Sequence, residues 1–428
     1  MTTSLRRRLA ATGIALVLAA GALGSAQSAT AGEATRTGKA APAGEAAPVE
    51  AAAVPALGPL FNNPTSGDPA AQNAIKNRIR ELIAAADPGS TIRMAMYHLW
   101  DNTIAQDLST AHTTRDVDVQ VVLDETTVSA PEGSRTSYDT LKAALGTDLA
   151  QDSYVTLCAK GRSCLGATAS GINHNKFLLF SSVGGGGATQ VVLQTSSNLT
   201  TSNYSRFWNS AVAFAGNATL YAAYSSYFGE LARQNRSTWT YTTAGSGDHK
   251  VYFFPRAGTT DDTDTVVNTL ENVGCTWSDA AGTHRTAVRV AMLKITRQAV
   301  ADKLRALAAA GCTVDVVYSE TDTGTWNALH GQTRLTPRCY QHDHDTDPGT
   351  PNRIVHSKNL LIDGVYAGAR EKLVFTGSHN YSGPALRDND ETMLRITTPA
   401  VHDAFAANFA QTKAAAFPGT ADATAVCR

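Results

Sequence analysis

Beyond its N-terminus, the sequence lacks any continuous apolar run of the ~18 residues that a membrane-spanning helix needs. It also lacks a net positive charge, because 36 Lys and Arg are balanced by 37 Asp and Glu to give a formal charge of −1. Nucleic-acid-binding proteins usually carry a basic surface. This chain is not basic as a whole, so it could bind nucleic acid only through a local basic patch. None of its six Cys forms a Cys-x-x-Cys pair. We therefore expect neither a zinc site nor any other metal or cofactor.

The N-terminus predicts a secretory signal peptide over residues 1–31. Three Arg precede an Ala/Leu-rich apolar stretch, and Ala29-Thr30-Ala31 offers a small-x-small cleavage site. A membrane anchor is the alternative, but the apolar stretch is short for a span. Cleavage would remove three Arg and no acid, which takes the formal charge from −1 to −4. Residues 32–56 are rich in Ala, Pro, Gly, Thr and Glu and predict a disordered linker. We expect a soluble, exported protein whose folded part begins near Leu57.

In an exported chain, an even number of Cys favours disulfides over metal ligation. Six Cys permit 15 connectivities, and the sequence orders them only by proximity. The favoured pairs are Cys158 with Cys164, which are close in sequence, Cys275 with Cys312, which share a repeat, and by elimination Cys339 with Cys427.

The folded part repeats itself with a period of about 190 residues, which indicates a domain duplication. The run Thr91–Met96 matches Ala287–Met292, and a helical pattern and a second strand follow each of them. Strands that alternate with helices are typical of α/β architecture, here with mixed sheets flanked by helices. We predict two α/β halves, residues 57–245 and 246–428, that join at a Gly/Ser-rich turn over Thr243–Asp248. The halves should pack around a pseudo-two-fold axis, with the ligand site beyond the strand ends.

One short phrase occurs in both halves, as His174-Asn175-Lys176 and as His356-Ser357-Lys358. The His and Lys of each copy are two residues apart on an apolar strand, so both side chains lie on one face. Each His also has an Asn 24 residues downstream, Asn198 and Asn380. Phosphodiester cleavage needs a nucleophile, an acid for the leaving alkoxide and stabilisation of the phosphoryl oxygens. Paired imidazoles, ammonium groups and amides supply all three, and two copies at one spacing indicate function.

These motifs resemble those of the phospholipase D superfamily, in which His-x-Lys-x4-Asp is followed by Gly-Ser-x-Asn. The second half matches fully, with Asp363 in the first motif, Gly377-Ser378-His379-Asn380 as the second, and Glu391 after it. The first half departs at two positions. Ser181 stands at the place of the Asp, and Asn209 stands opposite Glu391.

The resemblance implies a phosphohistidine intermediate, with one His as nucleophile and the other as general acid. It also implies that the acidic residue after one motif orients the His of the other half. Glu391 would then hold His174, while His356 would face Asn209 and release its proton more readily. We therefore predict His174 as the nucleophile and His356 as the acid. The predicted site comprises the catalytic His174, Lys176, His356 and Lys358, the phosphate-binding Asn198 and Asn380, and the supporting Ser181, Asn209, Asp363 and Glu391.

The predicted function is secreted hydrolysis of phospholipids to phosphatidate and a free head group, with transfer to alcohols as a second outcome. The acidic charge and the export signal favour this prediction, and we expect a monomer at a membrane or micelle surface. A nuclease of the same superfamily is the alternative, because Asn380 to Glu391 equally resembles the bacterial endonuclease branch. A phosphate-binding protein without activity is a third possibility.

Other segments give weaker signals. His342–Asp347 offers cation ligands, but a solvated loop is the favoured interpretation. Gly184–Gly187 predicts a hairpin loop, since no Lys-bearing helix follows as a P-loop requires. His379 is a candidate substrate contact. Three aromatic residues near the motifs either line the site or belong to the core, which is the commoner fate: Trp100, Trp208 and Tyr381.

Overall fold

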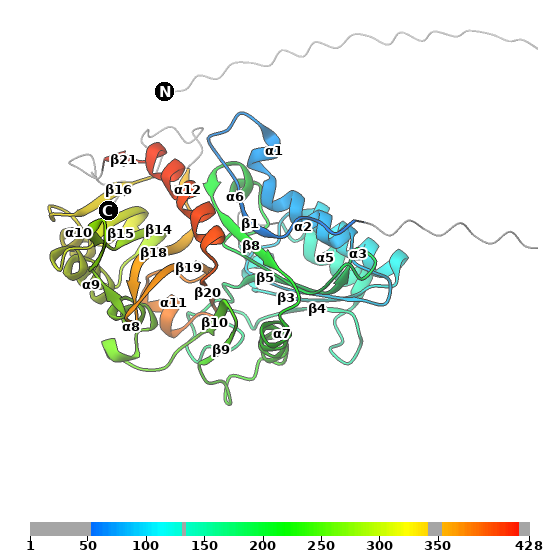
Figure 1. Cartoon of the computed structure of the whole chain (residues 1–428). Helices are drawn as coiled ribbons and strands as arrows, with labels where there is room; N and C mark the ends of the chain where they lie inside the picture. Colours follow the sequence, from blue (N-terminus) through cyan, green and yellow to red (C-terminus); the bar gives the residue numbers. More distant parts are fainter. Residues whose placement is uncertain (1–52, 131–133, 341–352, 419–428) are drawn as a thin grey trace, which may run out of the picture. The chain divides into compact units, whose positions relative to one another are not determined.

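The computed structural model describes residues 53–130, 134–340 and 353–418 (Figure 1). The predicted signal peptide, most of the predicted linker, the His342–Asp347 loop and Cys427 lie outside these residues. No helix among the described residues is both long enough and apolar enough to cross a membrane.

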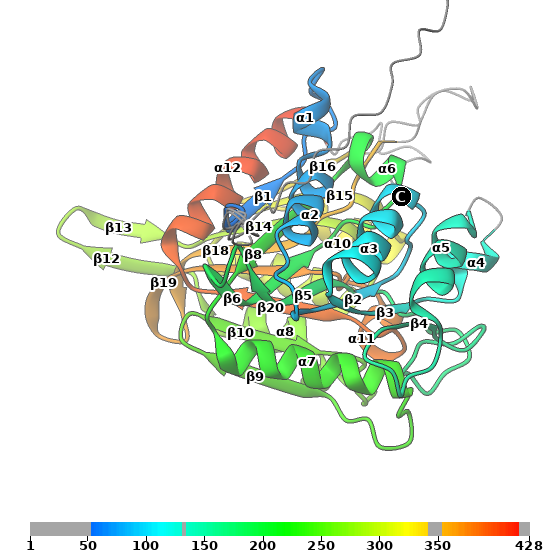
Figure 2. The same ribbon diagram turned by 90° about the vertical axis from the view of Figure 1, so that its right-hand side faces the viewer.

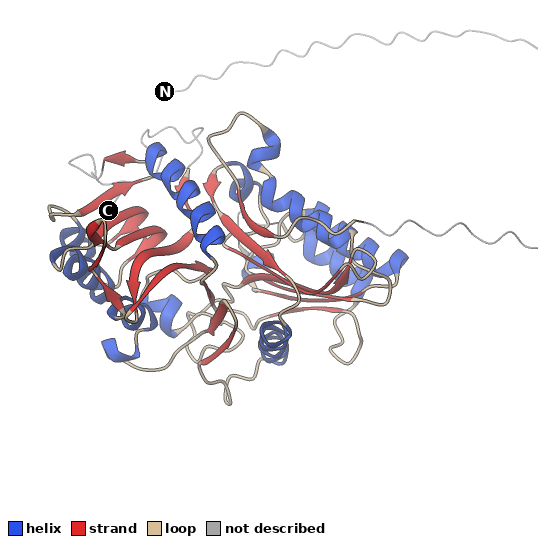
Figure 3. Cartoon of the chain, viewed as in Figure 1, coloured by secondary structure: helices blue, strands red, loops and turns tan. Residues whose placement is uncertain are grey.

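The first half builds a seven-stranded mixed sheet (Figure 3). Three adjacent strands, β2, β3 and β4, run parallel, and the remaining neighbours pair antiparallel. In spatial order the strands are β1 (Gly58–Phe61), β8 (Ser210–Phe214), β6 (Ala188–Thr195), β5 (Lys176–Val183), β2 (Thr91–Met96), β3 (Asp118–Leu123) and β4 (Tyr154–Leu157).

The second half builds a ten-stranded mixed sheet, in which β11 (Val273–Gly274) pairs with β18 off the main path. The other strands, in spatial order, are β21 (Phe417–Pro418), β16 (Leu335–Cys339), β15 (Thr313–Thr321), β14 (Ala287–Ile295), β18 (Lys358–Tyr366), β19 (Ala369–Gly377), β20 (Thr392–Ile396), β10 (His249–Phe253) and β9 (Thr242–Ser246).

The two sheets repeat one topology. The strand order β1-β8-β6-β5-β2-β3-β4 of the first sheet corresponds, strand by strand, to the order β10-β20-β19-β18-β14-β15-β16 in the second. The prediction of two duplicated α/β halves with mixed sheets is therefore confirmed. The turn predicted over Thr243–Asp248 is wrong in part, because Thr242–Ser246 forms β9 and pairs with β10. Backbone hydrogen bonds to a neighbouring strand override the weak strand propensity of its Gly and Ser.

Helices cover the outer face of each sheet (Figure 1). Helices α2 (Ala74–Ala84), α3 (Asn102–Arg115) and α5 (Thr136–Leu145) bury their apolar faces against the first sheet. Helices α8 (Thr265–Glu271), α9 (Gln298–Ala309) and α10 (Thr323–Leu329) do so against the second. The shorter helices are α1 (Pro69–Gln72), α4 (Thr126–Ser129), α6 (Thr201–Ser205), α11 (Gly383–Arg387) and the 3-10 turn η1 (Asp261–Thr263).

A third core cluster contains side chains from both sheets, together with α7 (Ala218–Arg233) and α12 (Pro399–Ala415). On β5 the side chains alternate: Phe177 and Leu179 join this shared cluster, whereas Leu178 and Phe180 face the outer helices. Strand side chains point alternately to opposite faces, so each central strand supports two cores at once. The halves thus meet through the inner faces of their sheets.

Two short strand pairs complete the fold. Strand β7 (Phe207–Trp208) of the first half pairs in parallel with β17 (Ile354–Val355) of the second. Strands β12 (Thr276–Asp279) and β13 (Gly282–Arg285) form a hairpin that projects from the second half (Figure 2). Gly184–Gly187 forms the predicted hairpin loop between β5 and β6.

The disulfides Cys158–Cys164 and Cys275–Cys312 are both present, as predicted. Cys339 is disulfide-bonded as well, and its predicted partner is not among the described residues.

Candidate active site

The two His-x-Lys motifs lie at equivalent ends of the central strands, since β5 begins at Lys176 and β18 begins at Lys358. All four side chains are buried, with relative exposures from 0% for Lys176 to 6% for His174. The charges of both lysines act on both imidazoles. The structure therefore brings the two motifs together in one site, as the duplication predicts.

Each His is held by the opposite half. The amide of His174 donates to the carbonyl of Asp390, and the amide of His356 donates to the carbonyl of Trp208, both at 2.9 Å. The two acceptors occupy equivalent positions in the two halves, because Asp390 follows Trp208 by 182 residues, just as His356 follows His174. The backbone thus clamps the two imidazoles symmetrically across the junction of the halves.

The rings differ in what they contact. Nδ1 of His174 lies 2.9 Å from both carboxylate oxygens of Glu391. Nδ1 of His356 lies 2.9 Å from Oδ1 of Asn209. The predicted cross-half pairs are therefore present, with a carboxylate on one His and a neutral amide on the other.

The amide of Asn209 has a fixed orientation. Its Nδ2 donates to the carbonyl of Asn203 at 2.9 Å and contacts that of Phe207, while its Oδ1 accepts from Ser196 Oγ at 2.8 Å. A flipped amide would set its oxygen against two carbonyls. Nδ1 of His356 must therefore donate, which leaves the lone pair of the neutral ring on Nε2.

Glu391 is fully buried, and Asn389 Nδ2 donates to its Oε1 at 3.2 Å. Burial raises the pKa of Glu391 to about 8, against the opposing charge of Lys176. Burial and the charges of Lys176 and Lys358 lower the pKa of His174 well below its ordinary value. A low dielectric disfavours charge on either partner, and a hydrogen bond from Nδ1 to the carboxylate leaves the lone pair of the neutral His174 ring on Nε2.

The lysines hold their ammonium groups inside the site. Lys176 Nζ donates to the carbonyl of His174 at 2.7 Å, and Lys358 Nζ donates to that of His356. Burial lowers the pKa of Lys176 to about 7. Burial and the charge of Lys176 lower the pKa of Lys358 well below its ordinary value. Two crowded cations favour an anionic ligand, which would restore their protonation.

Asn198 and Asn380 follow the strands next to the His-x-Lys strands, β6 and β19. Within the described residues, each side chain keeps a buried Oδ1 without a hydrogen-bond partner. A buried amide oxygen without a partner leaves the side chain available to a polar ligand. Their predicted role in phosphate binding stays a prediction.

An aromatic cavity of about 520 Å³ opens beside Asn198. Its wall includes Tyr97, His98, Trp100 and Phe207, with Ser and Thr hydroxyls around them. The rings of Tyr97, His98 and Trp100 stack in series at 3.7 and 4.3 Å. Of these residues the sequence singled out only Trp100. The position of the others directly after β2 and on β7 was the available signal, because ligand sites lie beyond strand ends.

This wall is joined to the catalytic groups. Tyr97 lies edge-on to His174 at 5.2 Å between centroids, and Lys176 Nζ lies 5.1 Å from the Tyr97 ring. The Phe207 ring stacks on that of His356 at 5.7 Å. Burial, followed by the charges of Lys176 and His174, lowers the pKa of His98 to about 3. His98 therefore contributes a neutral ring to the wall.

Several predicted residues have other roles. Ser181 Oγ accepts from the Thr91 amide at 2.8 Å and so ties β5 to β2. Asp363 lies 3.8 Å from Arg370, at the opposite end of β18 from His356. Asp363 therefore lies away from the imidazoles along a nine-residue strand, and its predicted supporting role stays a prediction.

Three further candidates are buried in the structure, namely His379, Trp208 and Tyr381. His379 packs on Phe254 at 4.3 Å between ring centroids, and its predicted contact with substrate stays a prediction. Trp208 and Tyr381 belong to the core clusters, which is the commoner fate expected for them.

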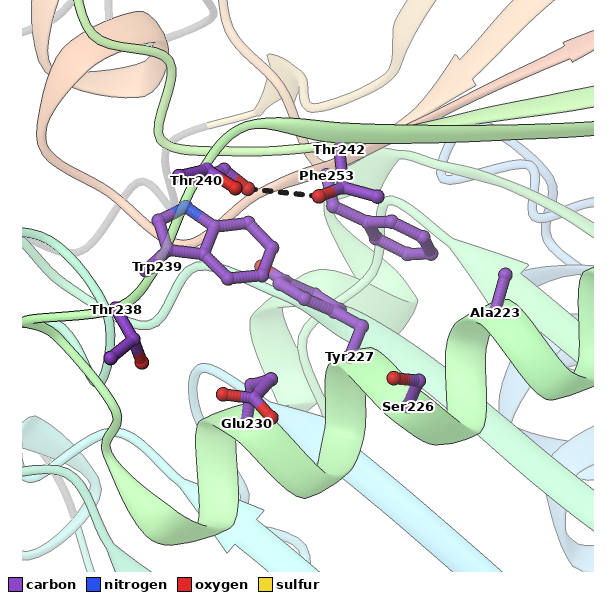
Figure 4. A pocket seen from close by; sticks show the side chains of 9 residues that line it. All are labelled: Ala223, Ser226, Tyr227, Glu230, Thr238, Trp239, Thr240, Thr242 and Phe253. Carbon is purple, nitrogen blue, oxygen red and sulfur yellow. Dashed lines mark hydrogen bonds between the residues drawn. The ribbon is translucent and has the colours of Figure 1, made fainter.

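Among the described residues, the possible metal ligands that gather in a group of three are Cys158, Cys164 and Asp390. Both Cys are consumed in a disulfide, so this group offers no thiolate. A separate pocket of about 410 Å³ lies against α7, lined by residues such as Tyr227, Trp239 and Phe253 (Figure 4). None of the predicted site residues lines it.

Comparison with known proteins agrees with this geometry. The family described as "Cardiolipin synthase, PLD-like domain" matches residues 79–232 and 281–413, one segment in each half. No protein of curated function matches the sequence significantly.

Two solved structures share the fold. Polyphosphate kinase from Porphyromonas gingivalis is 13% identical, with a TM-score of 0.52 over 83% of this chain and 50% of the kinase. Phosphatidylserine synthase from Haemophilus influenzae Rd KW20 is 12% identical, with a TM-score of 0.53 over 83% of this chain and 85% of the synthase. This chain thus spans half the length of the kinase. At such identities the likeness concerns the fold alone. The family match to both halves shows that the chain belongs to the phospholipase D superfamily, whose members act on phosphodiester bonds.

Proposed function

We propose that this chain is a secreted phosphodiesterase that cleaves its substrate through a phosphohistidine on His174. One observation carries the proposal: two equivalent buried imidazoles are held through Nδ1, one by Glu391 and the other by Asn209. Each neutral ring then presents Nε2 to the space that the two lysines share. A phosphodiester placed there meets one ring as a nucleophile, and its negative charge favours protonation of the other ring, which then serves as the acid.

In the first step, Nε2 of His174 attacks phosphorus, and the bond from phosphorus to the leaving oxygen breaks. His356 gives the proton of its Nε2 to that oxygen, which leaves as an alcohol. The substrate's negative charge raises the pKa of His356, so binding loads it with the proton that it transfers. Lys176 and Lys358 balance the charge on the phosphoryl oxygens, with Asn198 and Asn380 as neutral donors.

In the second step, His356 takes a proton from water, and the resulting oxygen attacks phosphorus. The bond to Nε2 of His174 breaks, which releases a phosphomonoester and restores the free enzyme. An acceptor alcohol in place of water gives a new diester by the same step. The protein thus supplies the same two groups to hydrolysis and to transfer.

The environment of the two rings supports this division of roles. A carboxylate beside His174 stabilises the positive charge that its ring gains on forming the adduct. Asn209 brings no charge to His356, so that ring gives up its proton more readily. The reverse assignment would place the adduct on the ring without a charged partner.

As substrate we propose a phospholipid, cleaved to phosphatidate and a free head group. The description of the matched family names a phospholipid synthase, and the predicted signal peptide would deliver the enzyme to external lipid. N-terminal sequencing of the mature protein from culture medium tests export. A mature chain that begins near Gly32 supports it, and an intact N-terminus inside the cell contradicts it.

A nuclease remains the second candidate because of one observation. The wall beside Asn198 is aromatic and polar, and stacked rings accept nucleobases. The large apolar side chains exposed among the described residues are Val54, Leu57 and Leu149. This is little apolar surface for contact with a membrane.

The mechanism is tested by trapping the adduct. Bis(4-nitrophenyl) phosphate has a leaving group that needs no acid, so His356→Ala should still become phosphorylated on His174, and the adduct should persist. His174→Ala should form no adduct. Peptide mass spectrometry after an acid-free quench locates the phosphoryl group. The assignment would be reversed if the His174→Ala variant carried an adduct on His356 and the His356→Ala variant carried none on His174.

The substrate is tested separately with mixed phospholipid vesicles and with DNA, by scoring released choline or ethanolamine against new oligonucleotide ends. Lys358→Met serves as the inactive control in both assays. Release of head groups supports the lipid proposal, and DNA ends alone would replace it with the nuclease. If the wild-type protein cleaves neither phospholipid nor DNA and forms no adduct in the trapping experiment, only a phosphate-binding role remains.

A further inference from the structure

The segment between Cys158 and His174 belongs to the first half but packs against Asp388–Glu391 of the second. Several hydrogen bonds join the two stretches, among them two between a side chain and the backbone and two between backbone groups. These four run from Ser163 Oγ to Asp388 O at 2.9 Å, from the Ile172 amide to Asn389 Oδ1 at 3.2 Å, from the Asp390 amide to Ile172 O at 3.0 Å, and from the His174 amide to Asp390 O at 2.9 Å.

Asp390 has no exposed surface, and its carboxylate still finds two donors in this segment. The amide of Cys164 donates to it at 2.6 Å, and the amide of Leu165 donates at 3.0 Å. A buried carboxylate without such donors would be strongly unfavourable. Burial raises the pKa of Asp390 well above its ordinary value, and these two amides oppose that shift.

The contact is too close for ordinary side chains. A Cβ at Gly166 would lie 2.0 Å from the Asp388 carbonyl oxygen, and one at Gly171 would lie 2.3 Å from it. Backbone occupies both spaces, so only Gly allows the segment to wrap around Asp388–Glu391. The arrangement therefore depends on the segment keeping its path.

A disulfide constrains the path of the segment directly beside Asp390. Cys158 and Cys164 are six residues apart and are bonded to each other, and Cys164 itself supplies one of the two amides to Asp390. Cys158 is anchored in turn, because its amide donates to the Leu123 carbonyl at 2.9 Å at the end of β3. The sheet of the first half is thus connected to Asp390 through a closed ring of chain.

Among the described residues, the other His has no carboxylate at the corresponding position. The position equivalent to Asp390 is Trp208, which also accepts from the amide of its His but carries no carboxylate. The buried carboxylate is therefore specific to the side of the site where Glu391 faces His174. Duplication alone does not explain it.

We propose that Asp390, held by the disulfide-closed segment 158–165, is a positioning residue for the contact between Glu391 and His174. Asp390 precedes Glu391 directly, and its carbonyl holds the His174 backbone, so a shift of Asp390 moves both partners. The importance of this contact for catalysis rests on the proposed function, but the positioning itself does not.

The test compares three full-length variants with the wild type. Asp390→Asn keeps the size of the side chain but turns an amino group toward one of the two amide donors. Cys158→Ser/Cys164→Ser opens the ring and leaves Asp390 in place, so it remains informative if Asp390→Asn does not fold. Cys275→Ser/Cys312→Ser removes the other described disulfide pair as a matched control.

The first measurement needs no substrate. The proton on Nδ1 of His174 gives a low-field NMR signal, assigned by its loss in His174→Ala. It should shift or broaden in Asp390→Asn and in Cys158→Ser/Cys164→Ser, and it should stay in place in the control. An unchanged signal in the first two variants, or an equal change in the control, overturns the proposal.

The second measurement uses bis(4-nitrophenyl) phosphate. The first two variants should lower kcat about tenfold or more with little change in KM, because small misplacements of catalytic groups are costly. The control should keep its kcat although its melting temperature falls. A kcat close to wild type in both, with the NMR signal displaced, would contradict the proposed role of the contact and leave the positioning intact.

Discussion

Nδ1 of His356 lies 2.9 Å from Oδ1 of Asn209, at the place where the other half pairs its His with a carboxylate. The equivalent residues Ser196 and Ser378 each form a hydrogen bond with the acceptor of their own half. Ser196 bonds to Asn209, and Ser378 bonds to Glu391. Around Nδ1 the two halves thus share a scaffold and differ in the acceptor, an amide in Asn209 and a carboxyl group in Glu391. That difference predicts unequal roles for two imidazoles whose backbone surroundings are alike.

Glu391→Gln should make the two sides alike. Without the carboxylate, His174 loses the group that stabilises positive charge on its ring, so the rate of adduct formation should fall roughly 10²-fold. Rapid-quench measurement of phosphorylated protein in a single turnover checks this. Glu271→Gln, which removes an equal charge at the exposed end of α8, is the control and should leave the rate unaltered. Equal rates for wild type and Glu391→Gln would show that the charge is not used.

Anion binding should depend on pH through Lys176. Its pKa of about 7 leaves the ammonium partly deprotonated near neutrality, and a bound anion favours the charged form. Sulfate, which stays divalent, should therefore bind with uptake of protons and lose affinity as the pH rises above about 7. Calorimetry in buffers of different ionisation enthalpy measures this uptake. Proton release on binding, or an affinity independent of pH, would contradict the depressed pKa.

Lys176→Met should stabilise the fold at the expense of binding. The pKa of Lys176 is about 7 in the folded chain against an ordinary 10.5. Between these values the unfolded chain binds more protons, so this Lys destabilises the protein most below pH 7. The variant should gain about 1–2 kcal/mol in unfolding free energy there, and the gain should vanish as the pH approaches 10.5. Urea titrations at several pH values test this, with the exposed Lys160→Met as control. A gain that grows with pH would refute the sign.

His379→Leu should be tolerated. Within the described residues, both ring nitrogens of His379 are buried without a hydrogen-bond partner, and burial lowers its pKa well below the ordinary value. Replacing an unsatisfied polar ring with an apolar side chain should raise the unfolding free energy by about 1 kcal/mol. The value of kcat should stay close to wild type. A large loss of activity without loss of stability would support His379 as a substrate contact.

Trp100→Ala should act on substrate recognition. Trp100 lines the cavity beside Asn198 at the end of the ring stack. Loss of one stacking partner should raise KM roughly tenfold or more for a diester with an aromatic or cationic group, with a smaller change in kcat. Trp239→Ala, in the pocket against α7, is the control. Comparing thymidine 5′-(4-nitrophenyl phosphate) with a phosphocholine ester shows which class the wall favours. Equal KM values for Trp100→Ala and wild type on both esters would exclude the wall from binding.

Much of the site could be predicted from the sequence because duplication made the chain its own comparison. The spacing of each His to its Lys fixes a common face on one strand, and the equal distance to Asn198 and Asn380 marks the second motif. The aromatic wall was largely missed, because Tyr97, His98 and Phe207 have no counterparts in the second half. Asp363 belongs to the motif but follows His356 by seven positions of extended chain, so the motif by itself does not place it beside the imidazoles.

The sequence by itself determined the α/β duplication, the two His-x-Lys strands and two of the disulfides, since each depends on local spacing or on comparison between the halves. Only the tertiary structure decided which atoms meet. The contacts of His174 with Glu391 and of His356 with Asn209 join residues 217 and 147 positions apart. Such contacts depend on how the inner faces of two sheets pack. The same packing sets the pKa of Lys176 and of Glu391, because burial beside like or unlike charges is a property of the assembled fold.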